Sequence, residues 1–241
     1  MPALLEVKGL SKSFAGLRAA HDLTFSVGEG EIVALIGPNG AGKTTCFNMI
    51  AGVYRPDAGL VLLEGQRLDG RRPDQICRAG VGRTFQLVKP FAGLSVLDNV
   101  VVGALKACRG VADARRCADE VLDLLGLGGK RGHPAASLTL PERKRLEVAR
   151  ALATGPRLLL LDEVMAGLRP TEIDLMVRVL RDLNATRGIT ILLIEHVMRA
   201  VMALAQRVVV MHHGELIAQG TPDEVTSNPA VIASYLGEEA V

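Results

Sequence analysis

The stretch "EIVALIGPNGAGKTT", residues 31–45, constrains the fold of this chain more than any other. Its first six residues predict a buried strand, and "CFNMIAG", which follows it directly, predicts a short helix that stops at Gly52. The segment between them fits the pattern G-x-x-x-x-G-K-[ST], which binds phosphate where a strand precedes it and a helix follows. This arrangement is typical of an α/β domain with a mainly parallel sheet.

Each residue type in this loop has a physical role in holding phosphate. Glycines let backbone N–H groups turn inward, and the helix adds the positive end of its dipole. Lys43 reaches the outer phosphates, and the Thr44 hydroxyl is a ligand for Mg²⁺. A glycine-rich turn without a ligand is the alternative, and the order of strand, loop, Lys and Thr argues against it. The predicted nucleotide-binding residues are Gly37, Pro38, Asn39, Gly40, Ala41, Gly42, Lys43, Thr44 and Thr45.

Two adjacent acids follow a second apolar stretch, "RLLLLDE". Asp162 ends the predicted strand at the sheet edge where ligands bind, so it can orient Mg²⁺. Glu163 comes one residue later, points elsewhere, and is the candidate general base that accepts a proton from an attacking water. The alternative, two acids that only cap a strand, would be favoured in an arbitrary chain but not beside a complete phosphate loop.

Apolar runs and helical patterns alternate along the rest of the chain. Strands are predicted at "LVLLEG", "RLLLLD" and "ITILLIE", and "RVVVMHHGELIAQG" predicts a terminal hairpin. From about residue 94 to 153 the apolar spacing is helical, as in "ADARRCADEVLDLLGLGG". We predict one domain over residues 1–241 with an inserted helical sub-domain at about 94–153.

The composition restricts the class of protein. Hydrophobic residues make up 49% of 241 residues, which suggests strands buried on both faces or a partner that covers part of the surface. The apolar runs are far shorter than the roughly 20 residues of a transmembrane helix, and no secretory signal pattern opens the sequence, so we expect a cytoplasmic location. A formal net charge of +2 gives no reason to expect a nucleic-acid partner.

In its motifs and their order, the chain resembles the ATPase subunits of ATP-binding cassette (ABC) transporters. "GRTFQ" ends in Gln86 where the family has its Q-loop, and "LLIEH" ends in His196 where it has its switch histidine. "LSKSF" ends in Phe14, which matches the aromatic residue that stacks on adenine. The resemblance implies a P-loop NTPase core with an N-terminal antiparallel β region, and ATP and Mg²⁺ as cofactors.

The resemblance also assigns roles to single residues. It implies that the Gln binds Mg²⁺ or the attacking water and contacts the membrane subunit, and that the His contacts the γ-phosphate. The implied catalytic residues are Glu163, His196 and Gln86, and the implied metal-binding residues are Thr44, Gln86 and Asp162.

A narrower resemblance, to the ATPase subunits of branched-chain amino acid importers, rests on phrases such as "GVGRTFQLVKPFAGLSVLDNVVVG" and "NPAVIASYLG". It implies a second ATPase subunit in a head-to-tail dimer, membrane permease subunits, and an external substrate-binding protein reached indirectly. The location implied is the cytoplasmic face of the membrane. Urea, amide and aromatic-acid importers share this subunit type, so the transported compound stays open.

We expect the loop around Gln86, with Val88 and Phe91, to form part of the groove that receives a permease helix.

The stretch "LTLPE", Leu138, Thr139, Leu140, Pro141 and Glu142, departs from the family signature "LSGGQ" that caps ATP on the opposite subunit. Thr139 and Glu142 fit a capping box, and Pro is tolerated in a first helical turn, so we predict that a helix still starts here. Leu140 adds bulk where glycine would admit phosphate, and Pro141 has no backbone N–H to donate.

Further departures lie close by. Val164 replaces the proline that usually follows the catalytic Glu, and Arg169 stands where the family generally has an Asp that communicates across the dimer. Arg143 and Lys144 lie one helical turn from Thr139, and we expect them to bring compensating positive charge to the phosphate.

Two other functions stay open. A non-transport ABC-superfamily ATPase is one, although a DNA-repair member would carry a long coiled coil and a translation member two cassettes. A nucleotide-binding regulator with little turnover is the other, and only the altered signature supports it.

Overall fold

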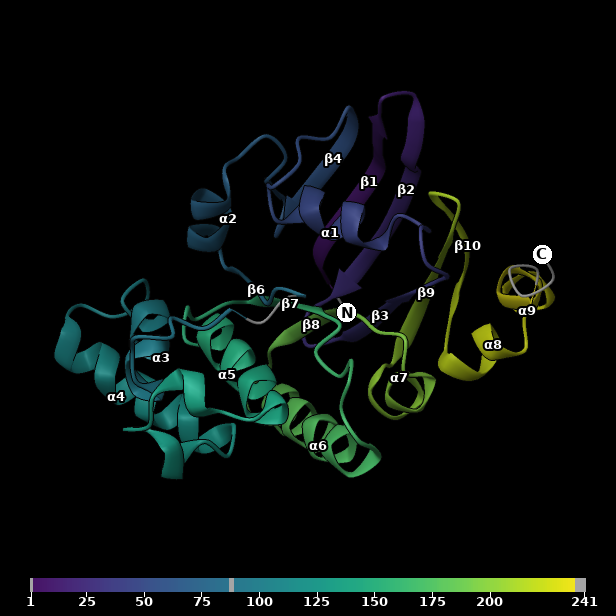
Figure 1. Ribbon diagram of the computed structural model, residues 1–241. Helices are drawn as coiled ribbons and strands as arrows, with labels where there is room; N and C mark the ends of the chain where they lie inside the picture. The colour runs from purple at the N-terminus through teal and green to yellow at the C-terminus, as the bar shows by residue number, and fades with distance from the viewer. Residues whose placement is uncertain (1, 87–88, 237–241) are drawn as a thin grey trace.

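The computed structural model describes residues 2–86 and 89–236 and contains two sheets (Figure 1). A six-stranded sheet has the order β10-β9-β3-β8-β7-β6, and a four-stranded sheet has the order β2-β1-β4-β5. The larger sheet comprises β3 (Ile32–Ile36), β6 (Val81–Arg83), β7 (Leu158–Asp162), β8 (Thr190–Ile194), β9 (Arg207–His212) and β10 (Glu215–Gly220). The smaller comprises β1 (Ala3–Phe14), β2 (Leu17–Gly28), β4 (Ala58–Leu63) and β5 (Gln66–Arg67).

The strand directions confirm the predicted fold class. In the larger sheet, β3 pairs in parallel with β8 and β9, and β7 pairs in parallel with β6 and β8, so that β10 alone runs antiparallel to its neighbour. All pairs of the smaller sheet are antiparallel, as predicted for an N-terminal antiparallel β region.

Both faces of the central sheet are buried, because successive side chains of a strand point to opposite faces. In β7, Leu159 and Leu161 belong to a core shared with the helices, whereas Leu158 and Leu160 belong to a core shared with β1 and β2. All five residues of β7 are buried, and the same holds for β3 and β8. A sheet covered on both faces explains the continuous apolar runs in the sequence.

Helices cover the sheet and extend from one end of it. The helices are α1 (Lys43–Ile50), α2 (Pro73–Ala79), α3 (Val96–Ala104), α4 (Val111–Leu124), α5 (Leu140–Leu152), α6 (Pro170–Arg187), α7 (Met198–Leu204), α8 (Pro222–Thr226) and α9 (Pro229–Leu236). In Figure 1, α3, α4 and α5 gather on the opposite side of the molecule from β10, α8 and α9. Within the described residues, no helix is both long enough and apolar enough to cross a membrane.

The helical stretch predicted from about residue 94 to 153 contains α3, α4 and α5. Its first helix is fixed to the loop before it by Asn99, which is fully buried. The Asn99 amide oxygen accepts the Phe91 backbone N–H at 2.8 Å, and its amide nitrogen donates to the Phe91 and Ser95 carbonyls at 3.1 and 2.9 Å. The loop that follows Gln86 is therefore anchored to α3.

Two element boundaries differ from the sequence predictions. Helix α1 begins at Lys43, earlier than "CFNMIAG" suggested, because Gly42 is its N-cap with a left-handed φ of 97°. The hairpin of β9 and β10 is not terminal, since α8 and α9 follow it.

Candidate functional site

Four parallel strands end at one edge of the central sheet, and the predicted site residues follow their ends. The phosphate loop follows β3, Gln86 comes after β6, Glu163 follows β7, and His196 comes after β8. The loop residues, Gln86, Glu163 and His196 line one cavity of about 460 Å³. The structure therefore brings together the phosphate loop and the three predicted catalytic residues.

The phosphate loop needs glycine at two positions because other backbone segments approach it closely. A Cβ at Gly37, whose φ is 147°, would lie 2.0 Å from the Met211 carbonyl oxygen. A Cβ at Gly42 would lie 2.1 Å from the Ala19 carbonyl oxygen. The loop is thus held between β9 and β2, with its backbone folded around the cavity.

Lys43 lies inside the loop. Its side chain is 6% exposed, and its ammonium donates to the carbonyls of Gly37 and Pro38, each at 2.7 Å. The ammonium is therefore held at the rim of the cavity where the outer phosphates of a nucleotide would lie.

The Glu163 carboxylate is held between two side chains. One oxygen lies 2.7 Å from His196 Nε2, and the other accepts a hydrogen bond of 2.9 Å from the Gln86 amide nitrogen. These three residues come from three different strand ends, so their contact depends on the register of the sheet.

The backbone of Glu163 adopts a left-handed conformation, with a φ of 50°, which is strained for a residue with a side chain. Three hydrogen bonds hold it there. Its N–H donates to Ile194 at 3.0 Å, and its carbonyl accepts from Lys144 Nζ at 2.8 Å and from the Ala166 N–H at 3.2 Å. The turn therefore directs the Glu163 side chain away from the strand and toward Gln86 and His196.

Asp162 is buried at the end of β7 and is 1% exposed. Its Oδ2 lies 3.3 Å from the Arg83 guanidinium, and its backbone N–H donates to the hydroxyl of buried Thr84 at 3.0 Å. Burial raises the pKa of the Asp162 carboxyl, and the ion pair with Arg83 opposes that rise only in part. Asp162 Oδ1 is buried and has no hydrogen-bond partner among the described residues.

The chemistry of this corner fits Mg²⁺. Thr44, Gln86 and Asp162, the three predicted metal-binding residues, all line a second cavity of about 490 Å³. They offer hydroxyl, amide and carboxylate oxygens, the donors that Mg²⁺ prefers, and the unpartnered Asp162 Oδ1 is one of them. In the described part of the chain, no group of three or more His, Cys, Asp or Glu could hold a metal by itself.

Phe14 does not line the phosphate-loop cavity. It ends β1, is 39% exposed, and packs edge-to-face against Tyr54 with 5.1 Å between ring centroids. On that flank the cavity is lined by Leu17, Arg18, Ala19 and His213, none of which the sequence motifs singled out.

The altered signature starts a helix, as predicted. The Glu142 carboxylate accepts the Thr139 N–H and the Thr139 hydroxyl, both at 2.9 Å, and α5 begins at Leu140. Leu140 is 41% exposed. Thr139, Pro141 and Glu142 share a cavity of about 210 Å³ with the start of α6, whose N-cap is Arg169.

The expectation that Lys144 brings charge to a facing phosphate is wrong, because its side chain points into its own chain and is 6% exposed. Arg143 is held by a hydrogen bond of 3.0 Å from its Nε to the Leu138 carbonyl. Val164 is buried, and Arg169 pairs with Glu172 at 2.6 Å on the surface.

Sequence reasoning missed Glu195, the residue before His196. It is 1% exposed, and its carboxylate accepts the Met165 N–H at 2.9 Å. Burial raises the pKa of Glu195 to about 7, although the backbone N–H groups of Met165 and His196 and the charge of Lys144 act in the opposite direction. A buried carboxyl group beside the turn at Glu163 thus fixes Met165. The phrase "IEH" gave no sign that its acid would be buried.

Comparison with known protein families gives matches over two parts of the chain. The profile of the family described as ABC transporter matches residues 20–166. The profile described as branched-chain amino acid ATP-binding cassette transporter matches residues 215–241.

Individual relatives cover nearly the full length. The high-affinity branched-chain amino acid transport ATP-binding protein LivG of Escherichia coli is 40% identical, with 98% of each chain covered. The corresponding protein BraF of Pseudomonas aeruginosa is 38% identical over the same share. The lipopolysaccharide export system ATP-binding protein LptB of Acidithiobacillus ferridurans is 35% identical, with 99% of each chain covered.

Among solved structures, an ATP-binding cassette of an ABC transporter in its ADP conformation superposes with a TM-score of 0.89. It is 29% identical and covers 98% of this chain and 100% of its own.

A first prediction concerns Glu195. Its pKa is raised on folding, so between pH 4.5 and about 7 the folded state holds a proton that the unfolded state has released. The parent therefore loses stability as the pH rises through this range. Glu195→Gln keeps an acceptor oxygen for Met165 but cannot ionise. The free energy of unfolding of Glu195→Gln minus that of the parent should thus increase by about 1–3 kcal/mol from pH 5 to pH 8.

Denaturant unfolding at several pH values measures this effect. Glu215→Gln, at an exposed position of β10, removes the same formal charge and serves as the control. A difference between Glu195→Gln and the parent that stays constant from pH 5 to pH 8 would contradict the prediction.

Proposed function

The chain belongs to the ATP-binding cassette transporter family, and from this premise we propose that it is the ATP-hydrolysing subunit of an importer for branched-chain amino acids or related small polar compounds. The observation that carries the catalytic part is the Glu163 carboxylate held between Gln86 and His196 on the phosphate-loop cavity. The names of the relatives LivG and BraF and the match of residues 215–241 support branched-chain amino acids as the transported compounds. The likeness to LptB, which is named for lipopolysaccharide export, is consistent with a cargo that other subunits select.

In this proposal the phosphate loop holds the triphosphate of ATP. Backbone N–H groups surround the phosphates, and the Lys43 ammonium exchanges its two carbonyl partners for phosphate oxygens. Thr44, Asp162 and Gln86 would hold Mg²⁺, which supplies neutralisation of charge on the outer phosphates.

Glu163 is the proposed general base. Its carboxylate lies beside the loop and takes a proton from the water that attacks the γ-phosphate. Gln86 and His196 each contact one oxygen of that carboxylate and so fix its orientation. In this proposal both also lie next to the γ-phosphate. Phe14, near the cavity but outside its lining, is proposed to meet adenine from the end of β1.

We propose further that residues 1–241 form one ABC ATPase domain with a helical sub-domain at about 94–153. This subunit pairs with a second ATPase subunit and with membrane permease subunits on the cytoplasmic face of the membrane. An external binding protein acts through the permease. The high apolar content is consistent with a subunit that partners cover.

A second prediction tests the catalytic assignment. Lys43→Ala should weaken ATP binding because the outer phosphates lose their cation. Glu163→Gln should keep ATP binding and lower turnover by roughly 10²- to 10⁴-fold, because an amide cannot accept the proton. ATP affinity and phosphate release, measured in the assembled complex, report the two effects. Hydrolysis by Glu163→Gln at the parent rate would show that Glu163 is not the base.

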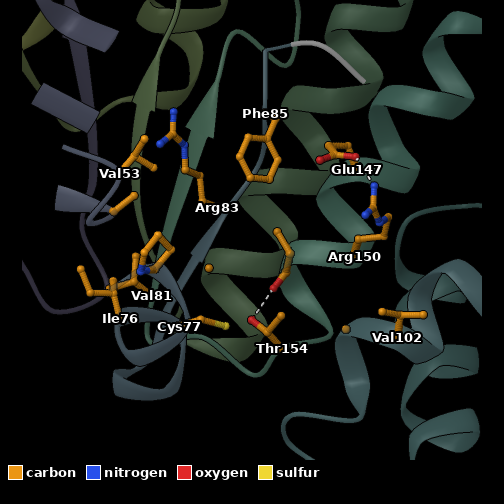
Figure 2. Close-up of a pocket in the computed structure, with 15 residues that line it drawn as sticks. Val53, Ile76, Cys77, Val81, Arg83, Phe85, Val102, Glu147, Arg150 and Thr154 are labelled. Atoms are coloured by element: carbon orange, nitrogen blue, oxygen red, sulfur yellow. Dashed lines mark hydrogen bonds and ion pairs between the residues drawn. The ribbon is translucent and has the colours of Figure 1, made fainter. Parts of the chain in front are cut away.

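The proposed permease site is an apolar hollow of about 260 Å³ between α2, α3, α5 and β6. Figure 2 shows Val53, Phe85 and Val102 around this hollow, with Glu147 and Arg150 paired at its edge. Phe85 is 56% exposed and Val102 is 46% exposed, so large apolar surface faces outward. Such a surface with a charged edge suits the end of an amphipathic helix.

The loop after Gln86 borders this hollow. The Arg150 guanidinium lies 4.7 Å from the Phe91 ring centroid, and Arg150 also donates to the Lys89 carbonyl at 3.2 Å. Val88, which the sequence also placed in the groove, lies outside the described residues.

A third prediction follows for Phe91. Phe91→Asp should reduce transport and permease-coupled ATPase activity, because it places a charge where an apolar helix surface would dock, while ATP affinity stays at the parent value. Ile232→Asp is a matched control, since Ile232 has the same 44% exposure but lies on α9, at the other end of the molecule (Figure 1). Crosslinks from Phe91 that reach only soluble proteins, and no permease, would contradict this site.

The signature stretch is proposed to cap the ATP of the partner subunit. Leu140 projects at the start of α5, and Thr139 offers a hydroxyl that is now bonded to Glu142. Pro141 has no N–H to donate to a phosphate, and neither Arg143 nor Lys144 extends freely to replace it. We propose that this signature holds the partner's ATP less firmly than a signature with glycines would. In a heterodimer the two ATP sites would therefore work asymmetrically.

A fourth prediction tests this weakness. Changing Leu140 and Pro141 together to Gly in the Glu163→Gln background should tighten ATP-dependent dimerisation by about 10- to 100-fold, the value of one hydrogen bond to a charged group. Sedimentation with and without ATP measures it. Unchanged or weaker dimers would show that "LTLPE" is already a competent signature.

The same signature favours a second candidate, a nucleotide-binding regulatory subunit with little turnover. ATPase activity measured with and without the membrane partners separates the two, because the regulator would stay inactive in both.

A further inference from the structure

The turn between β9 and β10 consists of His213 and Gly214, which both have left-handed backbones, with φ of 46° and 83°. Two-residue hairpin turns with two positive φ values strongly favour Asn or Asp followed by Gly, because short side chains tolerate the first position best. A histidine there is a costlier choice for the turn itself. This strained position lies on the phosphate-loop cavity.

Hydrogen bonds fix this turn to the phosphate loop and to β2. The Gly214 N–H donates to the Ala41 carbonyl at 3.1 Å, and the Gly214 carbonyl accepts the His21 N–H at 2.7 Å. The turn therefore cannot shift without moving the loop, and His213 keeps a defined place relative to a bound nucleotide.

The two flanks of the cavity differ in chemistry. Thr44, Gln86, Glu163 and His196 form the flank proposed for the γ-phosphate and the attacking water. Leu17, Arg18, Ala19 and His213 form the other, in which Leu17 is 73% exposed. An apolar side chain, a guanidinium and an imidazole suit a sugar and a flat base better than they suit a metal-bound phosphate.

We propose that His213 is a nucleotide-binding residue that contacts the ribose and base of ATP; this rests on the proposed ATPase function. One imidazole nitrogen donates a hydrogen bond and the other accepts one, which matches ribose hydroxyls, and the ring face can lie against a purine. The His213 side chain is exposed, and its ring lies 3.9 Å from that of His212 between centroids.

The position of His213 along the cavity favours the nucleoside over the phosphates. Gly214, the neighbour of His213 in the turn, approaches the Arg18 carbonyl, where an added Cβ would lie 3.1 Å away. Arg18 belongs to the strand that follows Phe14, the residue proposed to meet adenine. The base, the ribose and His213 would therefore share one flank.

The test compares ATP with tripolyphosphate, which has no nucleoside. His213→Asn removes the imidazole while keeping a residue that tolerates a left-handed backbone. We expect the Kd for ATP to rise about 3- to 10-fold, the value of one ordinary hydrogen bond, with the Kd for tripolyphosphate unchanged. His212→Asn is the matched control, since His212 is the adjacent residue but does not line the cavity, and both affinities should stay at the parent values.

Each outcome decides one question. Equal weakening toward both probes would place His213 on the phosphates and overturn the ribose–base contact, and unchanged ATP affinity would overturn the contact altogether. His213→Gly, which relaxes the turn, should show the same loss as His213→Asn; a loss in Asn but not in Gly would trace the effect to turn strain and overturn the proposal. Lys43→Ala should weaken both probes, and its failure to do so would contradict the ATP site itself rather than His213.

Discussion

The chemistry proposed for this protein depends on the register of four parallel strands. Because β3, β6, β7 and β8 end at one edge, the phosphate loop, Gln86, Glu163 and His196 meet there although they are far apart in the chain. Asp162 pairs with Ile194 at the last position of the β7–β8 ladder, which sets Glu163 beside His196. A one-residue shift in the register of a strand would move each of its side chains to the opposite face of the sheet. The packing of the two cores therefore fixes the register on which the site depends.

The position of Glu163 at the sheet edge does not by itself orient its side chain, because a regular strand would continue past Asp162 in an extended conformation. The left-handed turn at Glu163 redirects its side chain, and Lys144 stabilises that turn by donating to the Glu163 carbonyl at 2.8 Å. Burial lowers the pKa of Lys144, but the charges of Glu195, Glu163 and Asp162 act against this. The buried lysine is thus part of an internal charge cluster and is not available to a partner's phosphate.

The elements around the phosphate loop could be predicted from sequence because their signals are local. The buried strands end in turn residues, and the T-x-x-E capping box predicts the start of α5 without tertiary information. What escaped prediction depends on contacts between distant segments. Lys144 looks like one of several surface cations in "PERKR", and only the packing of α5 against β7 shows it to be buried. His213 lies in a sequence typical of a turn, and Glu195 lies in one typical of a strand end. Neither sequence indicates a ligand-binding or buried residue.

Helix α5 connects three surfaces that the proposed cycle must coordinate. Leu140 at its start belongs to the signature stretch and is exposed, Lys144 one turn later holds the turn at Glu163, and Glu147 and Arg150 lie at the proposed permease hollow. These positions span two to three turns of a helix that rises about 1.5 Å per residue, so they move nearly as one body. A permease helix that tilts α5 would displace the Lys144 ammonium from the Glu163 carbonyl, whereas one that leaves α5 in place would not. The hydrogen bond at Lys144 is therefore a second physical link between the proposed permease hollow and Glu163, in addition to the one through Phe85 and Gln86.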